Sequence, residues 1–174
     1  MKLNRIFLIL LLFFALGLSF LERIFPTVIY DFFAYPAGFL TSLFFNVPLE
    51  WNENHEVLIP LARQTIHVIP SCSGYGFFSL LLTISIWQMF RRFKGHQTIL
   101  FTLVMIPLVY IITIITNSAR MICAYQAHQA TKILLPPNFQ AAIHQGVGIF
   151  LFLSVLMATH LFFERKWHVR HKPL

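Results

Sequence analysis

The stretch Pro70-Ser71-Cys72-Ser73-Gly74-Tyr75-Gly76 lies where a polar segment meets a long apolar run. A cysteine at this point lies at the boundary between membrane and water, at the start of a transmembrane helix. Two further polar residues occur at similar boundaries: Arg120 follows the next apolar run, and His144 precedes the last one. We therefore expect the fold to bring Cys72, Arg120 and His144 together at one face of the membrane.

The composition is typical of a membrane protein. Of the 174 residues, 57% are hydrophobic and only 11% are charged, whereas a soluble domain carries about 25% charged residues. Several apolar runs approach the ~20 residues that cross a bilayer as a helix. The net charge of +7 does not indicate nucleic-acid binding, because the basic residues cluster at helix ends, where they act as topology signals.

The apolar runs predict an all-α polytopic membrane protein with about four full transmembrane helices, one broken or re-entrant segment and a short extracytoplasmic β-hairpin. Two β-favouring runs, 57–59 and 65–69, predict the hairpin. We expect one integral membrane domain in five parts: a first helix (1–23), a broken membrane segment (24–48), an extracytoplasmic segment (49–70), core helices carrying the site (71–163) and a basic tail (164–174). The core comprises helices at 73–90, 98–120 and 141–163, with a connector at 121–140.

The segment 24–48 is predicted to be broken for two reasons. Pro26 and Pro36 each remove a backbone donor from the helical hydrogen-bond ladder. Asp31 places a carboxylate in the segment, which is costly at the centre of a bilayer. A re-entrant or interfacial segment tolerates such features where protein buries its backbone groups.

The distribution of charge predicts the orientation. Placing both termini and the loop 91–94 in the cytoplasm leaves most of the 13 Lys and Arg residues inside and most of the six acidic residues outside, which satisfies the positive-inside rule. The chain is then a multi-pass protein of the plasma membrane. In this orientation Cys72, Arg120 and His144 all lie at the extracytoplasmic face.

A thiol, a guanidinium and an imidazole together supply the parts of acyl transfer through a thioester. The thiolate is the nucleophilic form of cysteine, and a nearby cation favours it. Arg120 is charged at any physiological pH, so it can stabilise a developing oxyanion. His144 can take the thiol proton and later return it to a leaving amine.

These residues resemble the motifs of a known family. Cys-Ser-Gly at 72–74, Asn117-Ser118-Ala119-Arg120 and His144 are similar in order and spacing to the exosortase/archaeosortase family over residues 57–163. The family consists of multi-pass membrane cysteine proteases, proposed to be transpeptidases. Their substrates are exported proteins with a C-terminal sorting signal made of a short motif, a transmembrane helix and a basic tail. The resemblance implies that Cys72 is the nucleophile, Arg120 the stabilising cation and His144 the acid/base. The short chain suggests a compact bacterial member such as exosortase K.

The supporting residues have alternative interpretations. Ser73 and Gly74 accompany the cysteine, and Asn117 lies one helical turn before Arg120. Asn117 either orients the Arg120 guanidinium or is an ordinary polar residue at a helix end. Cys123 is interpreted as structural, and a disulfide to the other cysteine is a minor alternative.

The main alternative function is a non-enzymatic membrane subunit or small carrier in which Arg120 binds an anionic group. This alternative predicts that replacing Cys72 by alanine is tolerated. We predict no metal or cofactor, because His67 and His128 lack the spacing of a metal-ligand motif. The sequence alone does not specify the substrate motif or the acceptor nucleophile.

Overall fold

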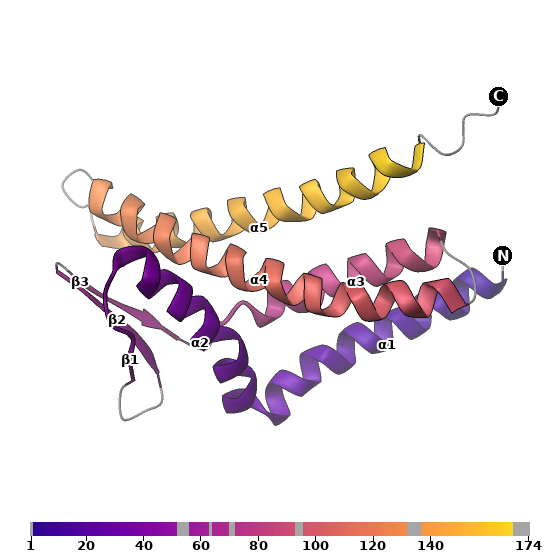
Figure 1. Cartoon of the computed structure of the whole chain (residues 1–174), viewed down its shortest axis with the longest axis horizontal. Helices are drawn as coiled ribbons and strands as arrows, with labels where there is room; N and C mark the ends of the chain where they lie inside the picture. Colours follow the sequence, from indigo (N-terminus) through magenta and orange to yellow (C-terminus); the bar gives the residue numbers. More distant parts are fainter. Residues whose placement is uncertain are drawn as a thin grey trace. The chain divides into compact units, whose positions relative to one another are not determined.

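The structure is a computed structural model that describes residues 2–51, 56–62, 64–69, 72–92, 96–131 and 137–168. These residues form helices α1 (Lys2–Ile24), α2 (Pro26–Phe45), α3 (Tyr75–Arg92), α4 (His96–Thr131) and α5 (Pro137–His168), with strands β1 (Glu50–Trp51), β2 (Val57–Leu61) and β3 (Gln64–Val68) (Figure 1). They group into two compact units, Met1–Ser118 and Ala119–Leu174. The end of the predicted cytoplasmic loop, 93–94, and the end of the basic tail, 169–174, lie outside the described residues.

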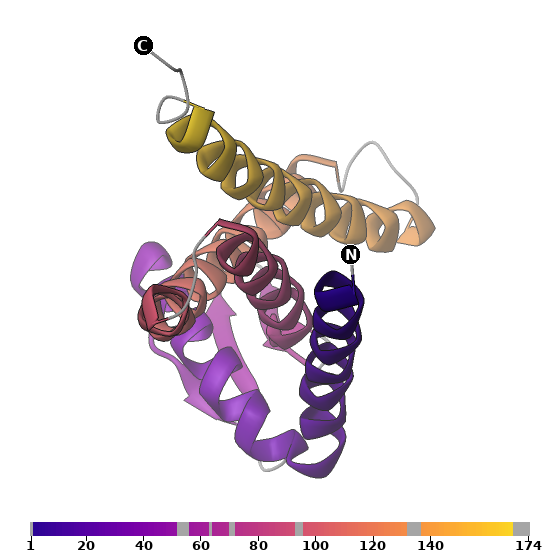
Figure 2. The same cartoon turned by 90° about the vertical axis from the view of Figure 1, so that its right-hand side faces the viewer.

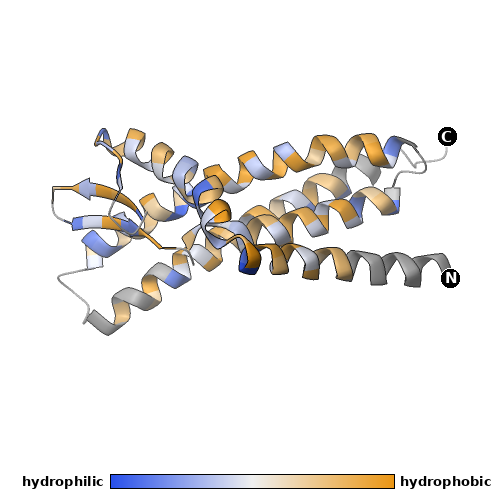
Figure 3. Cartoon of the chain, turned by 90° about the horizontal axis from the view of Figure 1, so that it is seen from below, coloured by the Kyte–Doolittle hydropathy of each residue, from blue (hydrophilic) through white to orange (hydrophobic). Residues whose placement is uncertain are grey.

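Among the described residues, three helical segments are long and apolar enough to cross a membrane. They are Pro26–Phe45, Gln97–Thr131 and Gln145–Glu164, with mean hydropathies of 1.3, 2.6 and 2.1. Figure 3 shows hydrophobic residues along the helices and hydrophilic residues near the strands and the helix ends. These helices indicate a membrane protein, and the count of four full spans stays a prediction.

The segment predicted to be broken forms one continuous helix, α2. Pro26 occupies the start of this helix, where the missing N–H has no helical partner to lose. Pro36 lies inside the helix and leaves the carbonyl of Phe32 without its helical donor. The hydroxyl of Tyr110 in α4 donates to that carbonyl at 2.8 Å. The segment is therefore not broken, because a neighbouring helix supplies this hydrogen bond, and the re-entrant or interfacial course stays a prediction.

The predicted hairpin is confirmed and forms part of a three-stranded antiparallel sheet with the order β1-β2-β3. Strands β2 and β3 pair from Val57↔Val68 to Leu61↔Gln64. Strand β1 was not predicted, since it has only two residues. Trp51 of β1 stacks on the ring of Tyr35 in α2, with centroids 5.5 Å apart and planes 13° from parallel. A tertiary contact therefore supports this strand.

One face of α2 packs against β2. Gly38 permits the close approach, because a Cβ at this position would lie 2.7 Å from Val57 Cγ1. The hydroxyl of Tyr30 accepts from the Val57 N–H at 2.9 Å and donates to the Val68 carbonyl. The hydroxyl thus bridges paired residues at the end of the β2–β3 ladder. The buried side of α2 follows helical spacing: Tyr30, Phe33, Ala34, Ala37, Gly38, Thr41 and Ser42.

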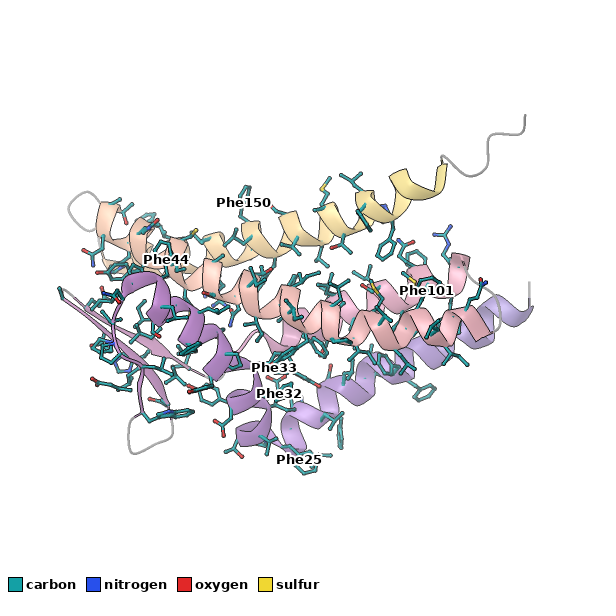
Figure 4. The ribbon with its side chains drawn as sticks, in the orientation of Figure 1. Phe25, Phe32, Phe33, Phe44, Phe101 and Phe150 are labelled. Carbon is teal, nitrogen blue, oxygen red and sulfur yellow. The ribbon has the colours of Figure 1, made fainter. Side chains whose placement is uncertain are left out.

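Helices α1 and α3 lie side by side and run in opposite directions (Figures 1 and 2). The hydroxyl of Tyr75, at the start of α3, donates to the carbonyl of Leu18 in α1 at 2.6 Å. The ring of Phe33 in α2 packs against Tyr75 and Phe78 of α3, with centroid distances of 5.3 and 5.1 Å. Figure 4 shows Phe33 between the helices and Phe25 at the outside. The first unit therefore has an aromatic core where α2 meets α3.

The last two helices are longer than predicted. The helix expected at 98–120 is His96–Thr131, and the helix expected at 141–163 is Pro137–His168. The 36 residues of α4 extend about 54 Å at 1.5 Å per residue, which exceeds the ~30 Å hydrocarbon core of a bilayer. The described parts of the predicted connector at 121–140 and residues 164–168 of the predicted tail are therefore helical. The predicted bounds end each helix where its apolar run ends, whereas the helical backbone continues beyond that point.

Candidate functional site

Cys72 lies in a short turn that directly precedes α3. Its N–H donates to the carbonyl of Ile69 at 2.8 Å, which ties the start of the helix to the residue after β3. The residue is half-buried, whereas Cys123 in α4 is exposed, and no disulfide joins the two. The predicted nucleophile thus lies at the N-terminal end of a helix.

Ser73 and Gly74 form the turn that begins α3. The Gly74 carbonyl accepts from the Phe78 N–H at 3.0 Å, which is the first hydrogen bond of the helix. The Ser73 hydroxyl accepts from the Tyr75 N–H at 3.4 Å. Gly74 has φ +88°, a conformation that favours glycine over residues with a Cβ. The positive φ at position 74 therefore explains why glycine is the third residue of Cys-Ser-Gly.

Asn117 of α4 contacts this turn directly. Its Nδ2 donates to the carbonyl of Cys72 at 2.8 Å and to the carbonyl of Ser73 at 3.0 Å. The Asn117 side chain is fully buried, with 0% of its surface exposed. The structure therefore brings Asn117, Ser73 and Gly74 together with Cys72. The contact to the cysteine backbone was not predicted, since the sequence pattern related Asn117 only to Arg120.

A second polar contact lies next to Asn117. The hydroxyls of Thr41 in α2 and Ser118 in α4 are 3.0 Å apart and buried. Thr41 also donates to the carbonyl of Ala37 in its own helix at 2.8 Å, so Ser118 can be the donor in the contact between the helices. Sequence analysis missed this pair because the two residues are 77 positions apart. The helical spacing of small residues in α2 is the only local signal for it.

Arg120 lies in the second unit and packs against α5. Its Cζ is 5.6 Å from the centroid of the Phe152 ring, within the range of a cation–π contact. A Cβ at Gly148 would lie 3.0 Å from Arg120 Nε and 3.2 Å from its Cδ. The arginine side chain therefore lies directly over Gly148, in space that the Cβ of any other residue at this position would crowd. The other predicted flanking glycine, Gly146, has nothing described within 4 Å of such a Cβ.

Position 144 belongs to α5, one helical turn before Gly148. The side chain of His144 lies outside the described residues, so its predicted role stays a prediction. Among the described residues, no group of three His, Cys, Asp or Glu side chains could hold a metal ion. Of the three predicted catalytic residues, the described side chains offer two reactive or charged groups: the Cys72 thiol at the start of α3 and the Arg120 guanidinium beside Gly148.

Comparison of the chain with protein-family models, curated proteins and solved structures found no match. The functional interpretation therefore depends on the residues and contacts described above.

Proposed function

We propose that this chain is a membrane-embedded cysteine protease or transpeptidase of the exosortase type. It cleaves the C-terminal sorting signals of exported proteins at the extracytoplasmic face of the plasma membrane. The proposed substrates end in a short motif, a transmembrane helix and a basic tail. Cys72, Arg120 and His144 carry the reaction.

The contact between Asn117 and the Cys72 backbone is the main support for this proposal. It joins two of the motifs on which the resemblance depends, although they are 45 residues apart in the sequence. The second motif ends at Arg120, which packs on Gly148 in the helix that contains position 144. Each motif therefore has a contact or a shared helix that links it to the next. Random polar residues at helix ends have no reason to be linked in this order.

The proposed reaction proceeds through a thioester. The Cys72 thiolate attacks the carbonyl carbon of the substrate, forming a C–S bond, and Arg120 stabilises the oxyanion. The C–N bond then breaks, and His144 gives the leaving amine the proton that it took from the thiol. An amine from an acceptor releases the acyl group by transfer, and water releases it by hydrolysis.

Co-expression with a tagged substrate tests the proposal. The substrate is an exported protein that carries the motif–helix–basic-tail signal, and processing is followed by blotting. Cys72→Ala should abolish processing, and Cys72→Ser should be nearly as damaging because serine has no equally strong base to activate it. Arg120→Lys keeps the charge but loses the planar donor geometry, and the loss should approach the ~10²–10³-fold cost of one oxyanion donor. His144→Ala should stall turnover.

Cys123→Ala is the matched control, since Cys123 is the other cysteine of the chain, is exposed, and belongs to α4 and not to the turn before α3. This variant should process substrate at the wild-type rate. Mass spectrometry of the wild type should detect the acyl group on Cys72 alone. If Cys72→Ala converts substrate as fast as the wild type, the enzyme proposal is wrong, and the non-enzymatic anion-binding subunit becomes the better explanation.

A further inference from the structure

Both backbone polar groups of Cys72 have a partner in the structure. Its N–H donates to the Ile69 carbonyl at 2.8 Å, within the same turn. Its carbonyl accepts from Asn117 Nδ2 at 2.8 Å, from a different helix. Fixing both groups fixes the peptide planes on either side of the Cys72 Cα. The direction of the Cα–Cβ bond is then defined, and the thiol can move only by rotation about χ1.

The Asn117 amide is itself held in place. The two N–H bonds of Nδ2 match two acceptors, the carbonyls of Cys72 and Ser73, at 2.8 and 3.0 Å. On its other side, the amide lies against Gly74, where a Cβ would be 3.1 Å from Asn117 Cγ. Complete burial of the side chain leaves no room for another rotamer in contact with water. A buried amide of this kind is held by hydrogen bonds that are costly to break.

We propose that Asn117 is a positioning residue that sets the direction of the Cys72 thiol for attack on the substrate carbonyl. This inference rests on the proposed function, in which Cys72 is the nucleophile. Asn117 touches no reacting atom and acts only through the backbone of residues 72 and 73. Its effect should therefore fall on the rate of acylation and leave the binding of substrate unchanged.

The asparagine amide is chemically suited to hold the two carbonyl groups, and neither aspartate nor alanine can replace it. Aspartate has the shape of asparagine but offers no N–H bonds, and its carboxylate would face the two carbonyl oxygens. Alanine removes the hydrogen bonds and leaves the turn free to rotate. Displacement of a reacting group by about 1 Å can cost ~10²-fold in rate. Both Asn117→Ala and Asn117→Asp should therefore lower kcat for processing by about 10²-fold, with little change in KM.

Thr113→Ala is the matched control for the asparagine variants. Thr113 is also fully buried in α4, one turn before Asn117, but its hydroxyl donates to Val109 within the same helix at 2.8 Å. A general weakening of α4 would affect both positions, whereas loss of positioning affects only Asn117.

The experiment measures kcat and KM for the tagged motif–helix–basic-tail substrate in membranes, together with the amount of each variant and the rate of acyl-enzyme formation. The expected result is slow acylation with unchanged KM for both Asn117 variants and wild-type kinetics for Thr113→Ala. Wild-type kcat in either Asn117→Ala or Asn117→Asp, with Cys72→Ala inactive, overturns the positioning role but not the proposed function. An active Cys72→Ala overturns the proposed function and this inference with it. If Asn117→Ala does not accumulate, the isosteric Asn117→Asp decides the result.

Discussion

At the scale of single residues, several buried side-chain polar groups in the first unit are paired with specific backbone groups. The hydroxyls of Tyr30 and Tyr75 and the amide of Asn117 each bond to the backbone of a different segment of the chain. A buried polar group that loses its partner costs about 1–3 kcal/mol. Such contacts therefore specify which residues lie at the same level, more sharply than apolar packing does.

The Arg120 side chain should be sensitive to any atom added at Gly148. In Gly148→Ala the new Cβ would lie 3.0 Å from Arg120 Nε, so the arginine side chain must shift by a few tenths of an ångström. We expect processing to fall by up to about 10²-fold, toward the cost of a lost oxyanion donor, while the protein still accumulates. Gly146→Ala adds the same methyl group where nothing described lies within 4 Å and should process substrate normally. Equal rates in the two variants would show that the position of Arg120 is unimportant.

The sequence predicted which residue types belong to the candidate site but not how they are held. Cys72 and Asn117 were singled out from their expected places at helix ends, and in the structure Asn117 contacts the Cys72 backbone, a contact that was not predicted. The Asn117–Cys72 contact spans 45 residues, and no periodicity or propensity encodes a contact of that separation. The three-residue spacing of Asn117 and Arg120 pointed to Arg120 as the partner, because local spacing is all that a single sequence displays.

At the scale of elements, local patterns predicted the hairpin and failed for α2. The runs 57–59 and 65–69 alternate and pair with each other, so all of the needed information is nearby in the chain. The continuity of α2 through Pro36 depends instead on Tyr110, which belongs to a different helix. Similarly, β1 depends on Trp51 stacking on α2. Elements that rely on a distant partner are the ones that sequence analysis missed.

The hydroxyl of Tyr110 should contribute to the free energy of unfolding mainly when residue 36 is proline. Tyr110→Phe removes the donor to the Phe32 carbonyl and should lower the free energy of unfolding by about 0.5–1.5 kcal/mol. Pro36→Ala restores a backbone N–H that can bond the same carbonyl within α2. In the Pro36→Ala background, Tyr110→Phe should therefore cost much less. Thermal unfolding of the four proteins in detergent measures this coupling, and additive effects would show that the hydroxyl does not replace the missing donor.

At the scale of the whole molecule, the contact between Tyr75 and Leu18 constrains the path of the chain through the membrane. Leu18 lies six residues before the end of α1 at Ile24, a rise of about 9 Å. The start of α3 therefore lies close to the level at which α1 ends. The separation of the two levels is much smaller than the ~30 Å thickness of a bilayer core. Length and composition mark α2 as a candidate span, but this contact argues that α2 and the sheet return to the side on which they began. The contact fixes the two helix ends at one level, whereas hydropathy reports only that α2 is apolar enough to span.

The orientation can be tested with single cysteines at two exposed positions in a Cys72→Ala, Cys123→Ala background. Glu50 lies in β1 and Gln97 at the start of α4, and both are exposed. If α1 crosses outward and α2 does not cross, Glu50→Cys reacts with a membrane-impermeant maleimide in right-side-out vesicles, and Gln97→Cys reacts only after permeabilisation. The positive-inside rule gives the same assignment, since it places the loop 91–94 in the cytoplasm. The reverse labelling, with Gln97→Cys accessible in intact vesicles and Glu50→Cys protected, would mean that α2 crosses fully and that the proposed site faces the cytoplasm, where exported substrates are out of reach.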